Sequence, residues 1–82
     1  MKVRILNPES VVFEAETDKI VLPALEGEIT ILPHHISIIT ALKKGRLSVH
    51  LRDKKIFQQE VAGGVCSFSD ERAAIILDEG QW

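Results

Sequence analysis

The sequence has 82 residues, of which 45% are hydrophobic, and a formal net charge of -2, so it forms one small folded domain at most. Its basic residues are scattered and only 5% of its residues are aromatic, which argues against a nucleic-acid-binding face. No apolar run approaches the roughly 20 residues that a bilayer-spanning helix needs, so we expect no direct membrane insertion. The single cysteine, Cys66, excludes an internal disulfide and suits a reducing compartment.

Short strand-like segments, separated by turn residues, make up the first part of the chain. Lys2–Leu6 alternates polar and apolar residues and stops at the turn-forming pair Asn7-Pro8. Val11–Phe13 resumes the strand pattern, and the acidic run Glu14–Asp18 is expected to end it. Lys19–Pro23 is β-branched and apolar, and its proline predicts a strand end or a sheet edge.

A polar loop between two apolar segments forms the middle of the chain. A Glu26-Gly27 turn leads into the apolar segment Ile29–Leu32, which a proline and the pair His34-His35 interrupt. The chain is apolar again up to Leu42, and the spacing of its apolar residues tolerates a helix over Ser37–Lys44, but the isoleucines and threonine favour a strand.

Alternation is clearest in the segment Arg46–Arg52, where Leu47, Val49 and Leu51 share one side. A tight turn at Asp53-Lys54 then predicts an antiparallel hairpin with the strand Lys55–Val61.

The last part of the chain predicts two more strands, over Val65–Phe68 and Ala73–Leu77, with a turn at Ser69–Glu71 between them. The preceding Gly63-Gly64 pair predicts a positive φ or a close approach of two backbones. Together these segments predict an all-β fold: a single small antiparallel β-sandwich of about ten short strands over residues 1–79, with 80–82 as a tail.

No catalytic constellation or metal site is expected from the sequence. His34 and His35 are adjacent, so in an extended segment they point to opposite faces, and His50 belongs to a separate strand. No cysteine or histidine spacing typical of a metal site is present. Cys66 lies in an apolar strand and is predicted to be a core residue. We therefore expect no cofactor and no enzymatic activity.

Taken together, several motifs resemble the N-terminal domain of the epsilon subunit of F-type ATP synthases. The family shows an acidic turn, an aliphatic pair, a Pro-x-His corner and an apolar run that ends in glycine. In this chain those elements are Glu26-Gly27-Glu28, Ile29 and Ile31, Pro33 with His35, Ile38-Ile39-Thr40-Ala41-Leu42 and Gly45.

The resemblance implies a β-sandwich that makes no bonds in substrates. Such a domain is a non-catalytic central-stalk (rotor) subunit that docks on the gamma subunit and the c-ring and couples proton flow to ATP synthesis. It would work as a peripheral part of the complex at the cytoplasmic face of the bacterial inner membrane. By motif position, the c-ring contact would fall on Glu26 and Glu28. The gamma contact would fall on Asn7, His35, Ile38, Ile39 and Thr40.

The chain also departs from the family pattern. His34 replaces a usual glycine, Thr30 a common glycine and Ser37 a usual proline, which changes the corner at Pro33. The sequence ends at Trp82 without the helical hairpin of longer members. We therefore expect it neither to inhibit ATP hydrolysis nor to bind ATP.

One alternative from a different functional class remains open. Lipoyl and biotinyl carrier domains are small flattened barrels with a modified lysine at a hairpin tip, a position that Lys54 would take here. The sequence also leaves open self-association of the isolated domain through the surface that gamma would cover, because an uncovered interface exposes apolar groups.

Overall fold

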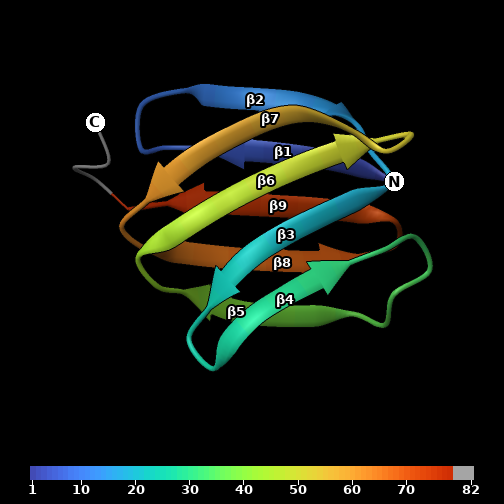
Figure 1. Cartoon of the computed structure of the whole chain (residues 1–82). Helices are drawn as coiled ribbons and strands as arrows, with labels where there is room; N and C mark the ends of the chain where they lie inside the picture. Colours follow the sequence, from blue (N-terminus) through green and yellow to red (C-terminus); the bar gives the residue numbers. More distant parts are fainter. Residues whose placement is uncertain (79–82) are drawn as a thin grey trace.

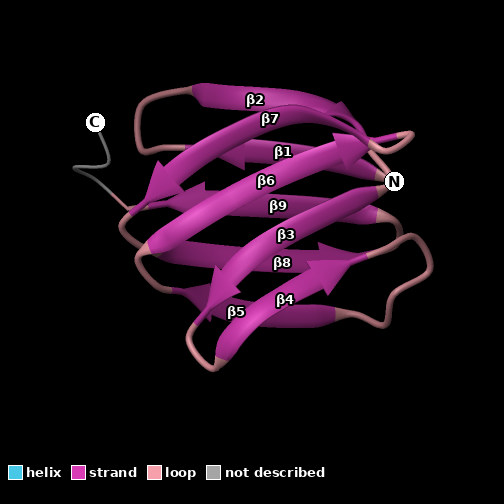
Figure 2. Ribbon diagram, viewed as in Figure 1, coloured by secondary structure: helices cyan, strands magenta, loops and turns pink. Residues whose placement is uncertain are grey.

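Residues 1–78 are described by a computed structural model, and within that range the chain is built of strands, turns and loops, without a helix (Figure 2). The nine strands are β1 (Lys2–Leu6), β2 (Val11–Glu16), β3 (Lys19–Ala24), β4 (Gly27–Ile31), β5 (Ile38–Leu42), β6 (Gly45–Leu51), β7 (Lys54–Val61), β8 (Gly64–Ser69) and β9 (Arg72–Leu77). The all-β prediction is confirmed, and residues 38–42 form a strand rather than a helix. The tail expected at 80–82, together with residue 79, lies outside the described residues.

Two layers of strands face each other (Figure 1). One layer has the order β2-β1-β9-β8-β5, and the other contains β4, β3, β6 and β7. A single pairing, Ala24 with Leu42, joins β3 to β5 and links the layers along one side. On the other side the rings of Phe13 and Phe57 stack at a centroid distance of 4.5 Å, which brings β2 and β7 together. The sandwich is therefore nearly closed.

Alternation along the strands builds the core between the layers. Residues at every second position turn inward, as the pleat of a strand requires. The buried apolar cluster consists of Val3, Ile5, Ile20, Leu22, Ile31, Leu42, Leu47, Val49, Val61, Cys66, Phe68, Ala73, Ile75 and Leu77.

One strand pair departs from the antiparallel prediction. β1 lies between β2 and β9 and runs parallel to β9, with Lys2 beside Arg72 and Leu6 beside Ile76. Antiparallel pairing is imposed by short hairpin connections. β1 and β9 lie near opposite ends of the described chain, so no hairpin constrains their direction.

Strand β2 is longer than the sequence predicts. The acidic residues Glu14 and Glu16 were expected to end it, yet they extend it and pair with Arg4 and Lys2 of β1. Opposite charges on neighbouring strands make acidic residues favourable there.

Pro23 was expected at a strand end or a sheet edge, but it lies inside β3, an inner strand. Its carbonyl accepts a hydrogen bond from Lys43 N at 2.8 Å, on the side where the pairing of β3 changes from β6 to β5. Proline lacks an N–H, and at this changeover the missing donor interrupts no regular ladder.

The β6–β7 hairpin turns one residue earlier than predicted. Its turn is Arg52-Asp53, with φ of 53° and 64°, and Lys54 already begins β7. Positive φ at both central residues is the geometry that matches the twist of a two-residue hairpin. The turn predicted at Ser69–Glu71 is confirmed, with Asp70-Glu71 in the same left-handed conformation.

Candidate docking surface

The outer face of the layer β2-β1-β9-β8-β5 carries a row of apolar side chains, one from each strand. In pairing order they are Val11, Leu6, Ile76, Val65 and Ala41. We call this set the apolar row. Ile76 is 54% exposed, and Val11 and Val65 are each 44% exposed. Contiguous exposed apolar groups mark surfaces that bind a partner.

Strand β5 lies at one end of the apolar row and contains three of the predicted gamma-contact residues. Ile39 points outward and is 79% exposed. Ile38 points inward and packs against the core cluster. Thr40 also lies on the inner side, opposite Cys66. Because neighbours alternate across a strand, Ile38 and Ile39 cannot both be anchors on one face, and Ile39 is the one on the outer face.

The loop before β5 is fixed to the turn between β8 and β9. His34 takes a left-handed φ of 69°, the conformation for which glycine is best suited. Its backbone N–H donates to Glu71 Oε1 at 2.6 Å, and its ring Nδ1 lies 3.5 Å from the same oxygen. These contacts offset the cost of the conformation, which explains how a histidine can stand where the related motif has glycine.

His35 is partly buried against the end of the core. Its ring meets Phe68 edge-on at a centroid distance of 6.1 Å, and its Nδ1 lies 2.7 Å from the carbonyl oxygen of Ile36. The backbone N–H of His35 donates to Leu32 O at 3.2 Å. The ring thus shapes the loop that begins β5.

Asn7 lies at the opposite end of the apolar row, directly after Leu6. Its side-chain Oδ1 accepts hydrogen bonds from the N–H groups of Glu9 and Ser10, both at 2.9 Å. With these two hydrogen bonds the Asn7 side chain takes the place of a backbone turn, and it shapes the connection between β1 and β2. Strands β9 and β8 separate β1 from β5, so the five predicted gamma residues do not form one cluster: Asn7 lies near one end of the row, and the other four lie on β5 or in the loop before it.

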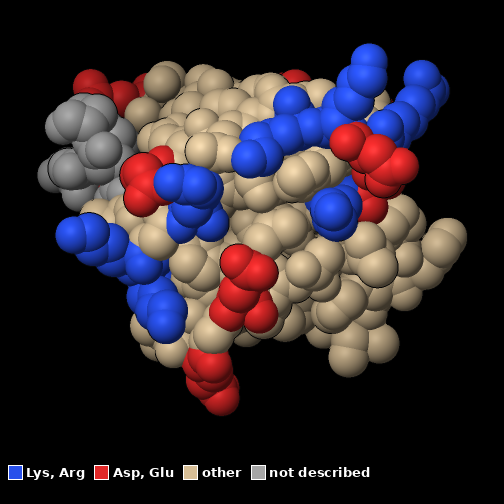
Figure 3. Space-filling view, in the orientation of Figure 1, with Lys and Arg blue, Asp and Glu red and all other residues tan. Residues whose placement is uncertain are grey.

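Glu26 and Glu28, the predicted c-ring residues, belong to the other layer. Glu26 lies in the turn before β4, and Glu28 lies on β4, which pairs with β3 alone in the described chain. Both are exposed, and neither forms an ion pair within residues 1–78. Charged side chains of both signs are scattered over the outer face of this layer (Figure 3).

The described residues offer little chemistry. Among residues 1–78 no three histidine, cysteine or carboxylate groups lie close enough to hold a metal ion. His50 contacts Ser48 Oγ through Nε2 at 3.0 Å. Burial lowers the pKa of His50, and the nearby Lys19 and Lys55 lower it further. The contact between the neutral imidazole of His50 and Ser48 in the same strand is a structural hydrogen bond within the sheet.

Cys66 is fully buried in β8, and burial raises the pKa of its thiol to about 12. The thiol therefore stays protonated at neutral pH, when the thiolate would be the reactive form. The prediction that Cys66 is a core residue is confirmed.

The raised pKa of Cys66 predicts a pH dependence of stability. Above pH 9.0 the unfolded thiol loses its proton while the folded thiol keeps it up to about pH 12. Stability must therefore fall as the pH rises through this window, by about 1.4 kcal/mol per pH unit. We expect urea titrations between pH 9 and 11 to show this extra loss in the wild type relative to Cys66→Ala. If the free energies of unfolding of the wild type and of Cys66→Ala fell in parallel with pH, the raised pKa of the Cys66 thiol would be contradicted.

Within residues 1–78 no helix is long and apolar enough to cross a membrane.

The whole sequence, residues 1–82, matches the family model described as ATP synthase, Delta/Epsilon chain, beta-sandwich domain. The chain is 39% identical over 77 residues to the ATP synthase epsilon chain of Desulforamulus reducens, covering 94% of this chain and 58% of that protein. It is 33% identical over 81 residues to the epsilon chain of Dehalococcoides mccartyi, covering 99% of this chain and 57% of the relative. The chain thus spans less than two thirds of the length of these curated relatives.

Solved structures share the fold, among them the following two. A chain of the Euglena gracilis mitochondrial ATP synthase, solved as OSCP/F1/c-ring, superposes with a TM-score of 0.82 at 23% identity, covering 92% of this chain and 48% of that one. A chain of the Tetrahymena thermophila mitochondrial ATP synthase central stalk and c-ring gives a TM-score of 0.80 at 15% identity, covering 96% of this chain and 63% of that one.

Proposed function

The chain belongs to the family of the β-sandwich domain of ATP synthase delta and epsilon chains, and from this membership we propose that it is a non-catalytic rotor domain of the central stalk. In this proposal it docks on the gamma subunit and on the c-ring of a proton-translocating F-type ATP synthase, and it helps to couple proton flow to ATP synthesis. The curated relatives are longer than the matched region, so the role of the complete subunit is part of the proposal.

The observation that supports gamma docking is the apolar row. It crosses all five strands of one layer, and Val11, Val65 and Ile76 present apolar surface to solvent. Covering such a row would remove apolar area from water, which stabilises a complex by about 25 cal/mol per Å² before the costs of association. Asn7 flanks one end of the row and Ile39 the other, so a partner seated on it would reach these two residues, whereas the side chain of Thr40 lies on the inner side of β5.

The c-ring contact is proposed for the other layer, at Glu26 and Glu28. Both carboxylates are exposed beside a free strand edge, and hydrated charges suit a polar rim contact with loops of a membrane ring. The domain itself enters no membrane in this proposal. It is held peripherally at the cytoplasmic face of the bacterial inner membrane through its partners.

Self-association of the isolated domain is a further proposal from the same surface. When the domain is isolated, a second copy is proposed to cover the apolar row, because two identical patches can pair about a two-fold axis.

A carrier function at Lys54 is the rival proposal. The turn residues Arg52 and Asp53 occupy the hairpin tip, and Lys54 already lies in β7, so the carrier geometry is not reproduced.

Co-purification tests the proposed function. The tagged chain is expressed together with the ATP synthase operon of its host, and the bound proteins and the intact mass of the chain are determined by mass spectrometry. We expect gamma and c subunits in the eluate and an unmodified chain. An eluate without gamma, together with a mass increment on Lys54, would favour the carrier function instead.

A further inference from the structure

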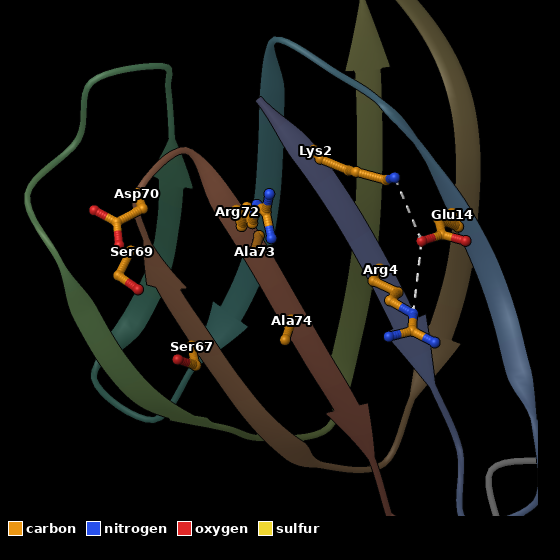
Figure 4. A pocket seen from close by; sticks show the side chains of 9 residues that line it. All are labelled: Lys2, Arg4, Glu14, Ser67, Ser69, Asp70, Arg72, Ala73 and Ala74. Carbon is orange, nitrogen blue, oxygen red and sulfur yellow. Dashed lines mark ion pairs between the residues drawn. The ribbon is translucent and has the colours of Figure 1, made fainter.

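A shallow hollow of about 750 Å³ lies on the same outer face as the apolar row, towards the other ends of the strands. Lys2 and Arg4 of β1 and Arg72 of β9 provide its positive charge (Figure 4). The remaining lining residues are Glu14, Ser67, Ser69, Asp70, Ala73 and Ala74. We call this feature the cationic hollow.

In the ion pairs of the cationic hollow, the cations outnumber the carboxylates. One oxygen of Glu14 lies 3.8 Å from Lys2 Nζ and 3.6 Å from Arg4 Nε, so two cations share a single carboxylate. Arg72 lies beside Lys2 across the parallel pair β1–β9 and is exposed. It forms no ion pair within residues 1–78. Its guanidinium therefore has donors available for an incoming acid.

Strand β9 connects the cationic hollow to the apolar row. Arg72, Ala74 and Ile76 lie at alternate positions on one face of this strand, so Arg72 and Ile76 are about 13 Å apart along it. One extended segment of a partner could therefore place an apolar side chain on Ile76 and a carboxylate on Arg72. A guanidinium binds a carboxylate through two parallel hydrogen bonds, which also fixes orientation.

We propose that the cationic hollow binds an acidic side chain of the same partner that covers the apolar row, with Arg72 as the residue that receives the carboxylate. This inference rests on the proposed function, in which that partner is gamma. It adds a specific charge contact to an apolar surface. Such charge contacts affect the rate of association and the register of the partner more than they raise the affinity.

The test compares Arg72→Glu with a matched charge reversal on the other layer, Arg46→Glu. Arg46 is also an exposed strand arginine, and its Nε lies 2.8 Å from Glu60. Binding of each variant to recombinant gamma is measured by biolayer interferometry at 50 and 300 mM NaCl, with circular dichroism to verify folding. We expect Arg72→Glu to weaken binding about tenfold or more at low salt and to reduce its salt dependence. Arg46→Glu should bind within about twofold of the wild type.

Each other outcome has a defined meaning. Equal affinities of Arg72→Glu and Arg46→Glu for gamma would overturn the inference. If Ile76→Asp abolished binding to gamma in that case, the proposed docking on the apolar row would still stand. If gamma bound all variants and the wild type alike, the docking face itself would be wrong. If Arg72→Glu lost sedimentation with phosphatidylglycerol vesicles but kept its affinity for gamma, the hollow would bind lipid rather than a protein acid.

Discussion

Replacing Gly64 by alanine should destabilise the domain by about 3 kcal/mol or more. Gly64 begins β8 with φ of +152°, a backbone conformation that side chains with a Cβ rarely adopt. An added Cβ would lie 2.3 Å from the carbonyl oxygen of Ile76 and 3.1 Å from Leu77 Cα. Both obstacles are backbone atoms of the paired strand β9, so relief requires the two strands to separate.

Gly27→Ala is the matched control, because Gly27 has a comparable φ of +134° but no atom within 4 Å of the added Cβ. It should show the conformational cost alone, about 1–2 kcal/mol. Urea unfolding of both variants gives the comparison. A domain of this size has a total stability of about 4–12 kcal/mol, so the effect at Gly64 is readily measured. A smaller loss for Gly64→Ala than for Gly27→Ala would show that β8 and β9 do not approach as described.

The largest expected effect on function belongs to Ile76→Asp. Ile76 occupies the centre of the apolar row, with Leu6 on one side and Val65 on the other. A carboxylate there would lose its water on docking without gaining a partner, and residues at the centre of an interface cost about 2–4 kcal/mol when altered. We therefore expect the affinity for gamma to fall by about 30-fold or more. Because Ile76 is on the solvent face, the isolated domain should lose less than about 1 kcal/mol of stability.

Ile56→Asp provides the control for this substitution. Ile56 is another partly exposed isoleucine, 38% exposed, on β7 of the other layer. It should retain wild-type affinity for gamma when both variants are titrated against gamma by isothermal titration calorimetry. Equal losses for Ile56→Asp and Ile76→Asp would point to a general effect of the added charge and against a docking face on β2-β1-β9-β8-β5.

The sequence was sufficient to predict the strands, because alternation with period two is a local property. It placed Leu47 and Val49 on one side of their strand, and both are buried. It also predicted a constraint at Gly63-Gly64, and the structure shows both the positive φ and the close backbone approach at Gly64. Most signals that lie within one segment were thus interpreted correctly, although the β6–β7 turn falls one residue before its predicted place.

Errors arose where a residue depends on a neighbouring strand. The extension of β2 through Glu14 required the cations of β1, and the position of Pro23 inside β3 required the changeover between β5 and β6. The parallel pairing of β1 with β9 brings together segments from the two ends of the described chain. None of these partners is adjacent in the sequence.

The candidate docking surface was only partly predictable for the same reason. Motif position predicted Asn7 and Ile39, which lie beside the two ends of the apolar row, and Thr40, whose side chain lies on the inner side of β5; their role in docking stays a prediction. Ile76 and Val65 look like ordinary strand residues in the sequence, because single exposed apolar residues are common. Only the register across five strands shows that they form one row. Similarly, Arg72 joins Lys2 and Arg4 only through the β1–β9 pairing.

Methyl NMR of the domain, recorded free and bound to gamma, is the most direct measurement of the proposed docking face. We expect the methyl signals of Leu6, Val65 and Ile76 to shift or broaden on binding. The signals of Val21 and Ile56, which belong to the other layer, should stay unchanged. Shifts confined to Val21 and Ile56, with Val65 and Ile76 unaffected, would contradict the assignment of the docking face.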